Sequence, residues 1–388
     1  MNNINTKKKL TLFHAVREAV FLKRPNRFVV ECLLDGKKVR AYLPNPGRLL
    51  ELLLPQSRLY LTPNRPDPEK STDYTCVAVE KAGVPVMLHT HHTNTVVRHL
   101  LDKGLISGLR EYSIVRQEVT MGNSRFDFLL EKGKKKFILE VKSCTLFGRR
   151  IAMFPDAVTA RGRRHVLELD ELRSRGYEGG VLFVIHSPSP RYFMPEHHTD
   201  LAFAETLYSL KNRIMVKAIS VGWGKDLTLS HTIQELKIPW DLGRKEAHDC
   251  GDYILILKVK KAGKIDVGIF GKYNFTQGYY CYAGSARRHL TKRIERHQRT
   301  RKNLHWHIDY LRNSAEFIAA LPVRSSDRLE CEIAGALSRI ASLPVPGFGS
   351  SDCSCGTHLF RMEENPLRSP TFIELLQYFR IDRLEKKL

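Results

Sequence analysis

Short apolar runs separated by turn signals fill the first 88 residues. RFVVECLLDGKKVRAYL (27–43) predicts two strands joined at Asp35-Gly36, a dipeptide typical of tight hairpins. Asn45-Pro46-Gly47 predicts the start of a short helix over RLLELLL (48–54), with Asn45 as its N-cap. The loop TPNRPDPEKSTD (62–73) follows. This pattern favours a small antiparallel sheet, and periodicity alone leaves open whether the sheet closes into a barrel.

Residues 111–240 have a different pattern. The runs SIVRQEV, RFDFLLE and KFILEV predict three strands, and TARGRRHVLELDELRSRG predicts a helix that ends at Gly176. GGVLFVIH and MVKAISVGW predict two further strands, with a helix over AFAETLYSLKNRI between them. Alternating strands and helices indicate an α/β layer.

The segment 236–250 has no clean period and is interpreted as a linker. After it, GDYILILKV, IDVGIFG and GYYCYAG predict strands, a long basic helix is expected over 286–302, and LECEIAGALSRI predicts another helix. We therefore expect an OB-like nucleic-acid-binding domain over 1–88, an α/β domain over 89–240, a linker over 241–250, and a small α+β domain with a C-terminal tail over 251–388.

Charge points to an anionic partner. The net charge is +22, with +13 over residues 1–250 and +9 over residues 251–388, so the excess is not confined to one tail. Nucleic acid is the simplest partner for such a surface, and an anionic membrane surface is second. No window approaches 18 apolar residues, and the N-terminal apolar run is too short for a signal peptide. The eight thinly spread cysteines indicate a reducing compartment, so we expect a cytoplasmic protein.

A first group of reactive side chains lies in SRFDFLLEKGKKKFILEVKSC (124–144). Residues two apart on a strand share a face, so Glu140 and Lys142 point the same way, and a hairpin brings Asp127 beside them. Mg²⁺ favours paired carboxylates, and a nearby lysine can orient water or stabilise a phosphate. An exposed hairpin with charges on its solvent face fits the same spacing, and the spacing alone favours that reading.

Several motifs in and around this segment also resemble those of known protein families. The string D-x12-E-x-K resembles the PD-(D/E)XK nuclease core, and residues 15–240 resemble the sugar fermentation stimulation protein A (SfsA) family. The resemblance rests on RPNRF, LPNPGRL, SRFDFLL, LEVKSCTL and FPDAVTARGRRHVLEL. It implies an OB fold followed by a nuclease domain, with Asp127 and Glu140 as metal ligands, Lys142 as the catalytic lysine and Glu118 as a further acid that completes the site.

Arginines near these motifs are candidates for nucleic-acid contacts. Arg24, Arg27 and Arg48 lie in the first two matching stretches. Arg161, Arg163 and Arg164 stand at a predicted helix start, where backbone amides and guanidinium groups suit a phosphate. A solvated helix face explains these three arginines equally well.

A second group of reactive side chains lies in the C-terminal part. Tyr253 and Tyr282 stand on two predicted strands, and Arg293 and His297 share one face of the basic helix. Two tyrosines, an arginine and an acid such as Glu330 can hydrolyse a phosphodiester around one metal ion. A small sheet with surface tyrosines and a basic helix is the alternative, which the residues alone favour.

The C-terminal part also has a resemblance of its own. GDYILIL, GYYCYAGSA, LTKRIERH, HWHIDYL, LECEIA and FGSSDCSCGTHLF resemble a GIY-YIG-related domain of unassigned function. The resemblance implies Tyr253 and Tyr282 as the paired tyrosines, Arg293 as the phosphate arginine and Glu330 as the metal-binding acid, although Glu332 flanks the same apolar stripe. Arg287, Arg288 and His297 are further candidates for nucleic-acid contacts.

Two smaller motifs carry possible ligands. Cys353, Cys355 and His358 have the spacing C-x-C-x2-H, which lacks a fixed fourth ligand, although Cys331 or Cys250 could fold near them. A loop without zinc is the favoured interpretation. HWHIDY (305–310) brings two histidines and an aspartate together, for which structural or substrate-contacting histidines are favoured over a metal site.

The function predicted from the sequence is a Mg²⁺- or Mn²⁺-dependent nuclease that hydrolyses DNA, RNA or both, with endonucleolytic cleavage favoured and a second GIY-YIG-like module. The alternative is a DNA-binding regulator of sugar metabolism that retains nuclease folds and cuts nothing. A scaffold in RNA metabolism or DNA repair is a weaker third hypothesis. A pure binder has no need to place paired acids against an anionic backbone, which favours catalysis.

Overall fold

The polypeptide passes three times between two structural units in the computed structural model, which describes residues 10–65, 72–268 and 271–388. One unit holds the chain up to Glu196 together with Ala202–Trp240, and the other holds His197–Leu201 and Asp241–Leu388. Among the described residues, every helix is too short or too polar to cross a lipid bilayer.

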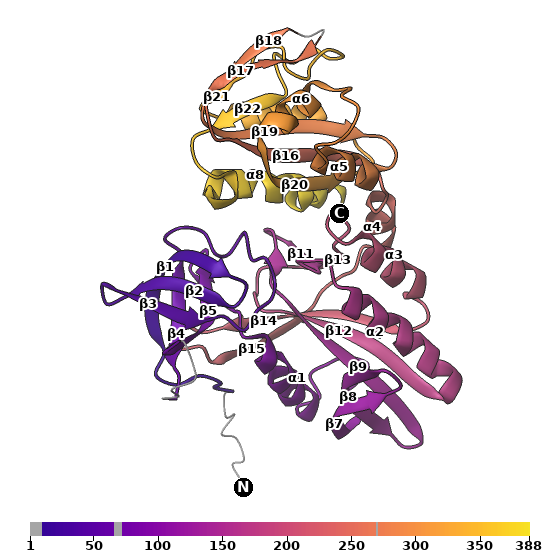
Figure 1. Ribbon diagram of the computed structural model, residues 1–388. Helices are drawn as coiled ribbons and strands as arrows, with labels where there is room; N and C mark the ends of the chain where they lie inside the picture. Colours follow the sequence, from indigo (N-terminus) through magenta and orange to yellow (C-terminus); the bar gives the residue numbers. More distant parts are fainter. Residues whose placement is uncertain (1–9, 66–71, 269–270) are drawn as a thin grey trace. The chain divides into compact units, whose positions relative to one another are not determined.

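A small barrel begins the first unit (Figure 1). Its strands follow the order β3-β2-β1-β4-β5-β6, and β3 also pairs in parallel with β5, which closes the ring. Asp35 and Gly36 both have positive φ, so the β2–β3 hairpin turns where the sequence predicts. The OB-like barrel is thereby confirmed. Its strands are β1 (Arg17–Asn26), β2 (Val29–Leu34), β3 (Lys37–Tyr42), β4 (Arg58–Pro63), β5 (Tyr74–Lys81) and β6 (Val84–Met87).

The helix predicted over 48–54 is wrong. This segment forms turns, in which the amides of Leu52 and Leu53 both donate to the carbonyl of Leu49. Leu49 has φ 54°, and its own amide donates to Asp156 Oδ2 at 2.7 Å. Because Leu49 is in the left-handed region and its amide is bonded to a distant carboxylate, the helix expected after the Asn45 N-cap does not form. The predicted loop over 62–73 lies partly outside the described residues.

An α/β domain completes the first unit. Its main sheet has the order β15-β14-β12-β9-β8-β7, with β9, β12 and β14 parallel to one another. A three-stranded sheet, β10-β11-β13, accompanies it. The main strands are β7 (Ser113–Met121), β8 (Ser124–Lys132), β9 (Lys135–Cys144), β12 (Tyr177–Ile185), β14 (Met215–Trp223) and β15 (Leu229–Glu235); the small sheet has β10 (Leu146–Phe147), β11 (Ile151–Phe154) and β13 (Tyr192–Pro195).

Helices cover both faces of the main sheet. The apolar side of α1 (Thr93–Asp102) packs on one face with Leu139 and Val141 of β9. On the other face, α2 (Ala160–Glu171) and α3 (Leu201–Leu210) share a core with Ile138. Because side chains alternate along β9, Glu140 and Lys142 lie on the α2 face. The predicted α/β layer is confirmed.

The second unit is built on an antiparallel sheet of order β20-β16-β19-β22-β21. The odd-numbered side chains of β16, such as Leu255 and Leu257, form a core with Leu290 of α5 and Ile308 of α6. A hairpin, β17–β18, stands beside it (Figure 1). The strands are β16 (Gly251–Val259), β17 (Gly263–Asp266), β18 (Lys272–Phe275), β19 (Gly278–Ala286), β20 (Glu316–Arg324), β21 (Leu343–Pro344) and β22 (Leu359–Met362).

One helix and one strand of this unit have other boundaries than the sequence predicts. The basic helix is shorter than 286–302, because α5 spans Leu290–Gln298 and the preceding His289 has φ 55°. The strand predicted over 265–271 ends at Asp266, and residues 269–270 lie outside the described residues. The other helices are α4 (Trp240–Glu246), α6 (His307–Ser314), α7 (Glu330–Ser338) and α8 (Pro370–Arg380). The predicted α+β class of this domain is confirmed.

Candidate functional site

Glu140 lies at the centre of the first candidate site. Its side chain is buried with 3% exposure on the β9 face that looks toward α2. Its Oε1 atom lies 2.6 Å from His165 Nδ1 and also accepts a hydrogen bond from Lys142 Nζ. Glu140 and Lys142 therefore share a face, as their spacing predicts.

Asp127 belongs to the neighbouring strand, β8. Its Oδ2 accepts a hydrogen bond of 2.7 Å from the Val141 amide, and its Oδ1 accepts one of 2.7 Å from Asn94 Nδ2. The backbone contact with Val141 fixes Asp127 beside the Glu140–Lys142 pair. Burial and the nearby charge of Glu140 raise the pKa of Asp127 to about 6.

A chain of hydrogen bonds keeps Glu140 ionised. Burial alone raises the pKa of Glu140, but His165 and Lys142 hold it below its ordinary value. Arg161 Nε donates to His165 Nε2 at 3.4 Å, so the proton of the ring lies on Nδ1 and is donated to Glu140. Among the described residues, the buried Glu140 Oε2 has no hydrogen-bond partner.

Glu118 is not joined to this group by any described contact. Its side chain is 64% exposed, and its carboxylate lies 3.6 Å from Arg125 on β8. Its backbone has φ 55°, a conformation that L-residues seldom adopt. The structure thus brings Asp127, Glu140 and Lys142 together and gives Glu118 a separate ion pair at the surface.

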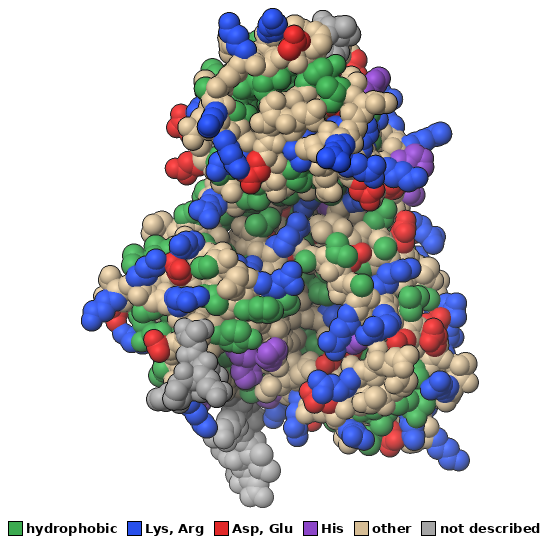
Figure 2. Space-filling view, viewed as in Figure 1, with side chains coloured by type: hydrophobic (Ala, Val, Ile, Leu, Met, Phe, Trp, Pro, Cys, Tyr) green, Lys and Arg blue, Asp and Glu red, His purple; other side chains and the backbone are tan. Residues whose placement is uncertain are grey.

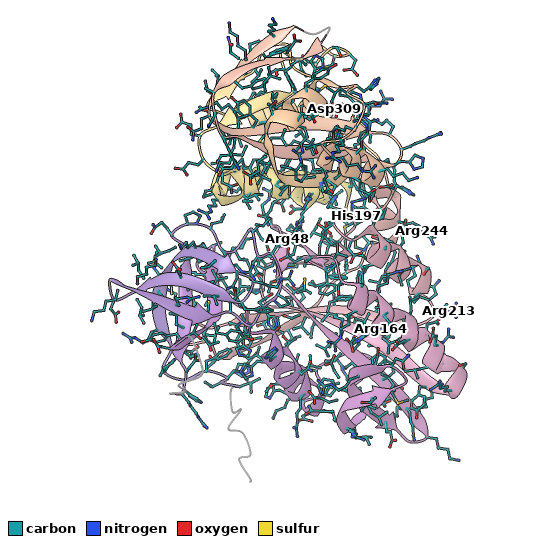
Figure 3. The ribbon with its side chains drawn as sticks, in the orientation of Figure 1. Arg48, Arg164, His197, Arg213, Arg244 and Asp309 are labelled. Carbon is teal, nitrogen blue, oxygen red and sulfur yellow. The ribbon has the colours of Figure 1, made fainter. Side chains whose placement is uncertain are left out.

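The arginines of the barrel differ in what they contact. Arg24 donates to the carbonyls of Asn45, Gly47 and Arg48, so it supports the loop after β3. Arg48 donates through Nε to the carbonyl of Asp156 at 2.9 Å (Figure 3). Arg27 is exposed and lines a pocket of about 230 Å³.

This pocket joins the barrel loop to the α/β domain within the first unit. Asn45 and Gly47 line one side of it, and Ser143, Thr145 and the segment 153–159 line the other. A Cβ atom on Gly47 would lie 2.8 Å from Asp156 Oδ2, so the close approach of the two loops requires glycine there. The pocket includes Ser143, the residue directly after Lys142.

The three arginines of α2 are all exposed. Thr159 caps this helix by accepting a hydrogen bond from the Gly162 amide. Arg161 contacts His165, Arg163 Nε donates to Thr206 Oγ1 at 2.9 Å, and Arg164 pairs with Glu168 at 3.6 Å (Figure 3). Figure 2 shows Lys and Arg side chains spread over the visible face of each unit.

The second candidate site brings both predicted tyrosines together. The rings of Tyr253 and Tyr282 lie 6.5 Å apart between centroids. Tyr253 OH lies 2.9 Å from His297 Nε2, and both side chains are buried. A Cβ atom on Gly284 would lie 2.5 Å from Tyr253 OH, so the tyrosine ring occupies the space that this glycine leaves.

A buried carboxylate stands behind the tyrosine–histidine pair. Asp309 Oδ1 lies 3.5 Å from His297 Nδ1 and 2.7 Å from Lys302 Nζ. Although burial raises the pKa of Asp309, its contacts with His297 and Lys302 hold the pKa well below its ordinary value. The motif HWHIDY thus supplies Asp309, a buried acid that holds neighbouring side chains in place. Figure 3 labels this residue.

Arg293 and Glu330 also lie near the tyrosines. Burial raises the pKa values of Tyr253 and Tyr282, the charge of Arg293 opposes this shift, and the charge of Glu330 adds to it. The Arg293 guanidinium lies over the Trp306 ring at 4.0 Å. Glu330 Oε2 accepts a hydrogen bond of 2.5 Å from Ser285 Oγ.

The remaining predicted residues differ in exposure. Glu332 points to solvent, so the structure brings Glu330, and not Glu332, toward the tyrosines. Arg287 donates to Asp252 Oδ1 at 3.4 Å, and Arg288 is exposed. His297 is 1% exposed and contacts Tyr253, so a direct contact with nucleic acid would require the site to open.

Sequence reasoning did not connect two side chains with the carboxylates of the first site. Asn94 lies 33 positions before Asp127, and only the packing of α1 brings its amide to that carboxylate. His165 falls inside the quoted motif FPDAVTARGRRHVLEL, so its position in that motif was the available signal for its role.

The class of protein defined by these features is an OB-fold domain joined to a nuclease-like α/β domain, with a further α+β domain. Three family models match the chain: "SfsA N-terminal OB domain" at residues 22–88, "Sugar fermentation stimulation protein RE domain" at 91–226 and "Domain of unknown function DUF123" at 252–380. The chain belongs to the sugar fermentation stimulation protein family and carries a GIY-YIG-related domain of unassigned function after it.

Similar proteins cover the first unit. The "Sugar fermentation stimulation protein homolog" of Clostridium tetani is 37% identical over 195 residues, which are 50% of this chain and 84% of the relative. Its namesake from Clostridium kluyveri is 36% identical over 221 residues, 56% of this chain and 96% of the relative. The solved "structure of Pyrococcus Furiosus SfsA in complex with Ca2+" matches with 28% identity and TM-score 0.55, covering 60% of this chain and 99% of that one.

Proposed function

We propose that the first unit is a nuclease dependent on Mg²⁺ or Mn²⁺, with Asp127, Glu140 and Lys142 at its centre. The observation that carries the proposal is Glu140 Oε2, which is buried without a hydrogen-bond partner among the described residues, beside a second carboxylate. A buried oxygen left unpaired carries a free-energy cost that a bound cation would offset. The proposed domains are 1–88, 89–240 and 251–388. The segment 241–250, predicted as a linker, holds most of α4 and groups with the second unit.

Asp127 and Glu140 would hold the metal ion. Carboxylate oxygens are the ligands that Mg²⁺ prefers, and it keeps several waters and takes phosphate oxygens as well. Bound there, the ion would polarise the scissile phosphate and lower the pKa of a bound water. The relative from Pyrococcus furiosus is described in complex with Ca²⁺, a divalent cation with the same preference for oxygen ligands, which supports this choice.

The other side chains would prepare the site for hydrolysis. Lys142 Nζ contacts Glu140 and would donate to a phosphate oxygen or to the attacking water. His165 donates through Nδ1 to Glu140 and so keeps this carboxylate ionised and oriented. Asn94 would fix the rotamer of Asp127 in the same way. Glu118 would join only if its strand moved its carboxylate inward.

Nucleic acid is the substrate that this surface favours. The charge of +13 over residues 1–250 attracts phosphates, and an OB barrel often binds single strands in a basic groove. The pocket beside Ser143 would admit a backbone phosphate, with Arg27 and Arg48 on the barrel side and Arg161, Arg163 and Arg164 at the start of α2. Either DNA or RNA is compatible with these contacts, and the cytoplasm is the proposed compartment.

A second nuclease site is proposed in the C-terminal domain. Burial holds the pKa of Tyr253 above its ordinary value, so the phenol is protonated in the resting site. It would first pass this proton to His297 Nε2, 2.9 Å from its OH, and the resulting tyrosinate would then act as base toward the attacking water. Arg293 would stabilise the phosphorane, and Glu330 would hold the metal ion. Arg287 and Arg288 would add contacts to the phosphate backbone.

Substrate cleavage tests the proposal against a non-catalytic regulator. Labelled single- and double-stranded DNA and RNA are incubated with the full chain in Mg²⁺, Mn²⁺ or EDTA. Cleavage that EDTA abolishes supports the nuclease. Salt-dependent binding without cleavage under every metal condition favours the DNA-binding regulator.

A further inference from the structure

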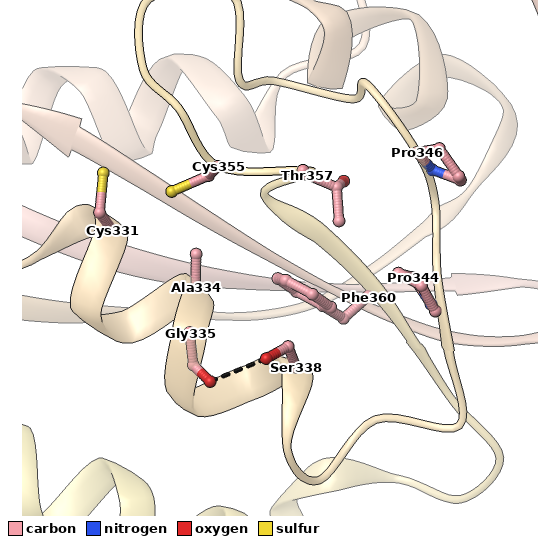
Figure 4. Close-up of a pocket in the computed structure, with 10 residues that line it drawn as sticks. Cys331, Ala334, Gly335, Ser338, Pro344, Pro346, Cys355, Thr357 and Phe360 are labelled. Carbon is pink, nitrogen blue, oxygen red and sulfur yellow. Dashed lines mark hydrogen bonds between the residues drawn. The ribbon is translucent and has the colours of Figure 1, made fainter.

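Four potential ligands for a soft metal meet within the C-terminal domain. Cys331 belongs to the first turn of α7, and Cys353, Cys355 and His358 belong to the segment before β22. One ligand atom from each residue lies within 4.8 Å of the other three. In Figure 4 the sulfur atoms of Cys331 and Cys355 face one another from the helix and the loop.

Backbone contacts hold the loop in this place. The His358 amide donates to the carbonyl of Phe348 at 2.8 Å, and the Ala283 amide donates to the carbonyl of His358 at 2.9 Å. Gly347 has φ 70° and donates to the carbonyl of Gly356, so the loop turns tightly there. Because Ala283 belongs to β19, the ligands are tied to the central sheet.

We propose that Cys331, Cys353, Cys355 and His358 bind one structural Zn²⁺ ion. Three thiolates and one imidazole are a ligand set typical of tetrahedral structural zinc. Cys353 Sγ lies 3.4 Å from His358 Nε2. Zinc bond lengths in a regular tetrahedron place sulfur and nitrogen ligands about 3.6 Å apart, so this pair is already close to the spacing that zinc needs.

The chemistry of the ligands selects the metal. Thiolates are soft ligands that favour Zn²⁺ over Mg²⁺ or Ca²⁺, which favour oxygen. The fourth ligand that the sequence left open is Cys331, because Cys250 Sγ instead contacts the carbonyl of Ser325. A helix residue therefore completes a site whose other three ligands are local in sequence.

The second nitrogen of His358 has a partner suited to a zinc ligand. His358 Nδ1 lies 3.4 Å from Glu330 Oε1, and His358 is 1% exposed. A carboxylate on the far nitrogen of a ligating histidine fixes the orientation of the ring and strengthens the bond to zinc. Glu330 also accepts a hydrogen bond from Ser285, so the proposed ion would anchor the start of α7 to β19.

Metal content of the full chain tests this proposal without any assay of nuclease activity. The protein is purified under reducing conditions from zinc-supplemented medium, dialysed, and analysed by mass spectrometry for metals. We expect one Zn²⁺ per chain in the wild type and in Cys250→Ser, and loss of that ion in Cys353→Ser and Cys355→Ser. Replacement by Co²⁺ should give the visible absorption of tetrahedral cobalt with thiolate ligands.

Substitution of two glutamates of α7 tests the contact between Glu330 and His358. Glu330→Gln should weaken zinc affinity by about 10-fold, whereas Glu332→Gln on the same helix should not change it. Wild-type protein that holds no zinc and gives no thiolate–cobalt absorption would overturn the proposal, and so would zinc retained in a Cys353→Ser/Cys355→Ser double variant. The wild-type measurement decides the matter even if the cysteine variants fail to fold.

Discussion

His165 Nδ1 lies 2.6 Å from Glu140 Oε1, which ties the start of α2 to the central strand β9. The contact favours the ionised form of a buried carboxylate whose second oxygen, Oε2, has no hydrogen-bond partner in the described part of the chain. Arg161 contacts the far nitrogen of the same ring, so a residue that could also meet a phosphate is linked to the proposed metal ligand.

Loss of His165 should weaken metal binding. In His165→Ala the pKa of Glu140 rises, because a hydrogen bond that stabilises the carboxylate is removed and burial remains. Outer contacts of this kind change metal affinity by roughly 10- to 100-fold. Calorimetric titration with Mn²⁺ at pH 7 measures the effect, with Arg164→Ala on the exposed side of α2 as control. Equal affinity in both variants would show that His165 does not support the site.

Metal affinity should depend on pH. The pKa of Asp127 is raised to about 6, so without metal this carboxylate is protonated below pH 6 and ionised above it. Protons compete with the cation for the ionised form, so affinity for Mn²⁺ should rise between pH 5 and 7 and then level off. A flat profile over this range would contradict the assignment of Asp127 as a ligand.

Gly284 should not tolerate a side chain. A Cβ atom there would lie 2.5 Å from both Cζ and OH of Tyr253, whose ring is buried. Overpacking of this kind costs about 1–3 kcal/mol. We expect Gly284→Ala to lower the thermal transition of the C-terminal unit in calorimetry. Gly263→Ala, with no atom within 4 Å of the new Cβ, is the matched control and should leave the transition unchanged.

Glu246 should stabilise the C-terminal unit. It is fully buried, and it accepts hydrogen bonds from Ser325, Arg383 and Lys387. Breaking a buried pair by removing one charge costs roughly 3–5 kcal/mol, so Glu246→Gln should destabilise this unit strongly. Glu363→Gln, an exposed acid of the same unit, serves as control.

The pH dependence of stability follows from the same group. Burial raises the pKa of Glu246, but the hydrogen bonds and charges of Lys387 and Arg383 outweigh this effect and lower the pKa to about 2. The folded pKa lies below the unfolded one, so this stabilisation is complete above about pH 4.5 and is lost as pH falls toward 2. Between pH 4.5 and 2, the unfolding free energy of the C-terminal unit should fall less in Glu246→Gln than in the wild type. An equal fall in both proteins would show that Glu246 is not the source of this pH dependence.

Local patterns predicted the fold and part of the geometry of the candidate site. Asp35-Gly36 gave the correct hairpin, and the two-residue period placed Glu140 and Lys142 on one face, because both depend only on neighbours in sequence. Contacts between distant residues were not predictable. The left-handed Leu49 is held by Asp156, more than a hundred positions away, and this overrode the helical pattern of 48–54.

The passage of residues 197–201 into the second unit has no sequence signal either. His198 accepts a hydrogen bond from the Arg324 amide and lies 2.7 Å from the carbonyl of Arg380. A fragment that begins at residue 250 lacks both His198 and Glu246. The full chain is therefore the appropriate material for testing the C-terminal domain.

Cleavage by Glu140→Gln and Glu131→Gln decides whether the first unit is a metal-dependent nuclease. Because the C-terminal domain is proposed to cut as well, both variants are made in a Tyr282→Phe background and assayed on labelled DNA and RNA with Mg²⁺. Glu140→Gln should lose EDTA-sensitive cleavage while still binding nucleic acid, and Glu131→Gln, an acid of strand β8 outside the proposed site, should retain it. Full cleavage by the Glu140→Gln protein would contradict a metal-dependent nuclease at Asp127, Glu140 and Lys142.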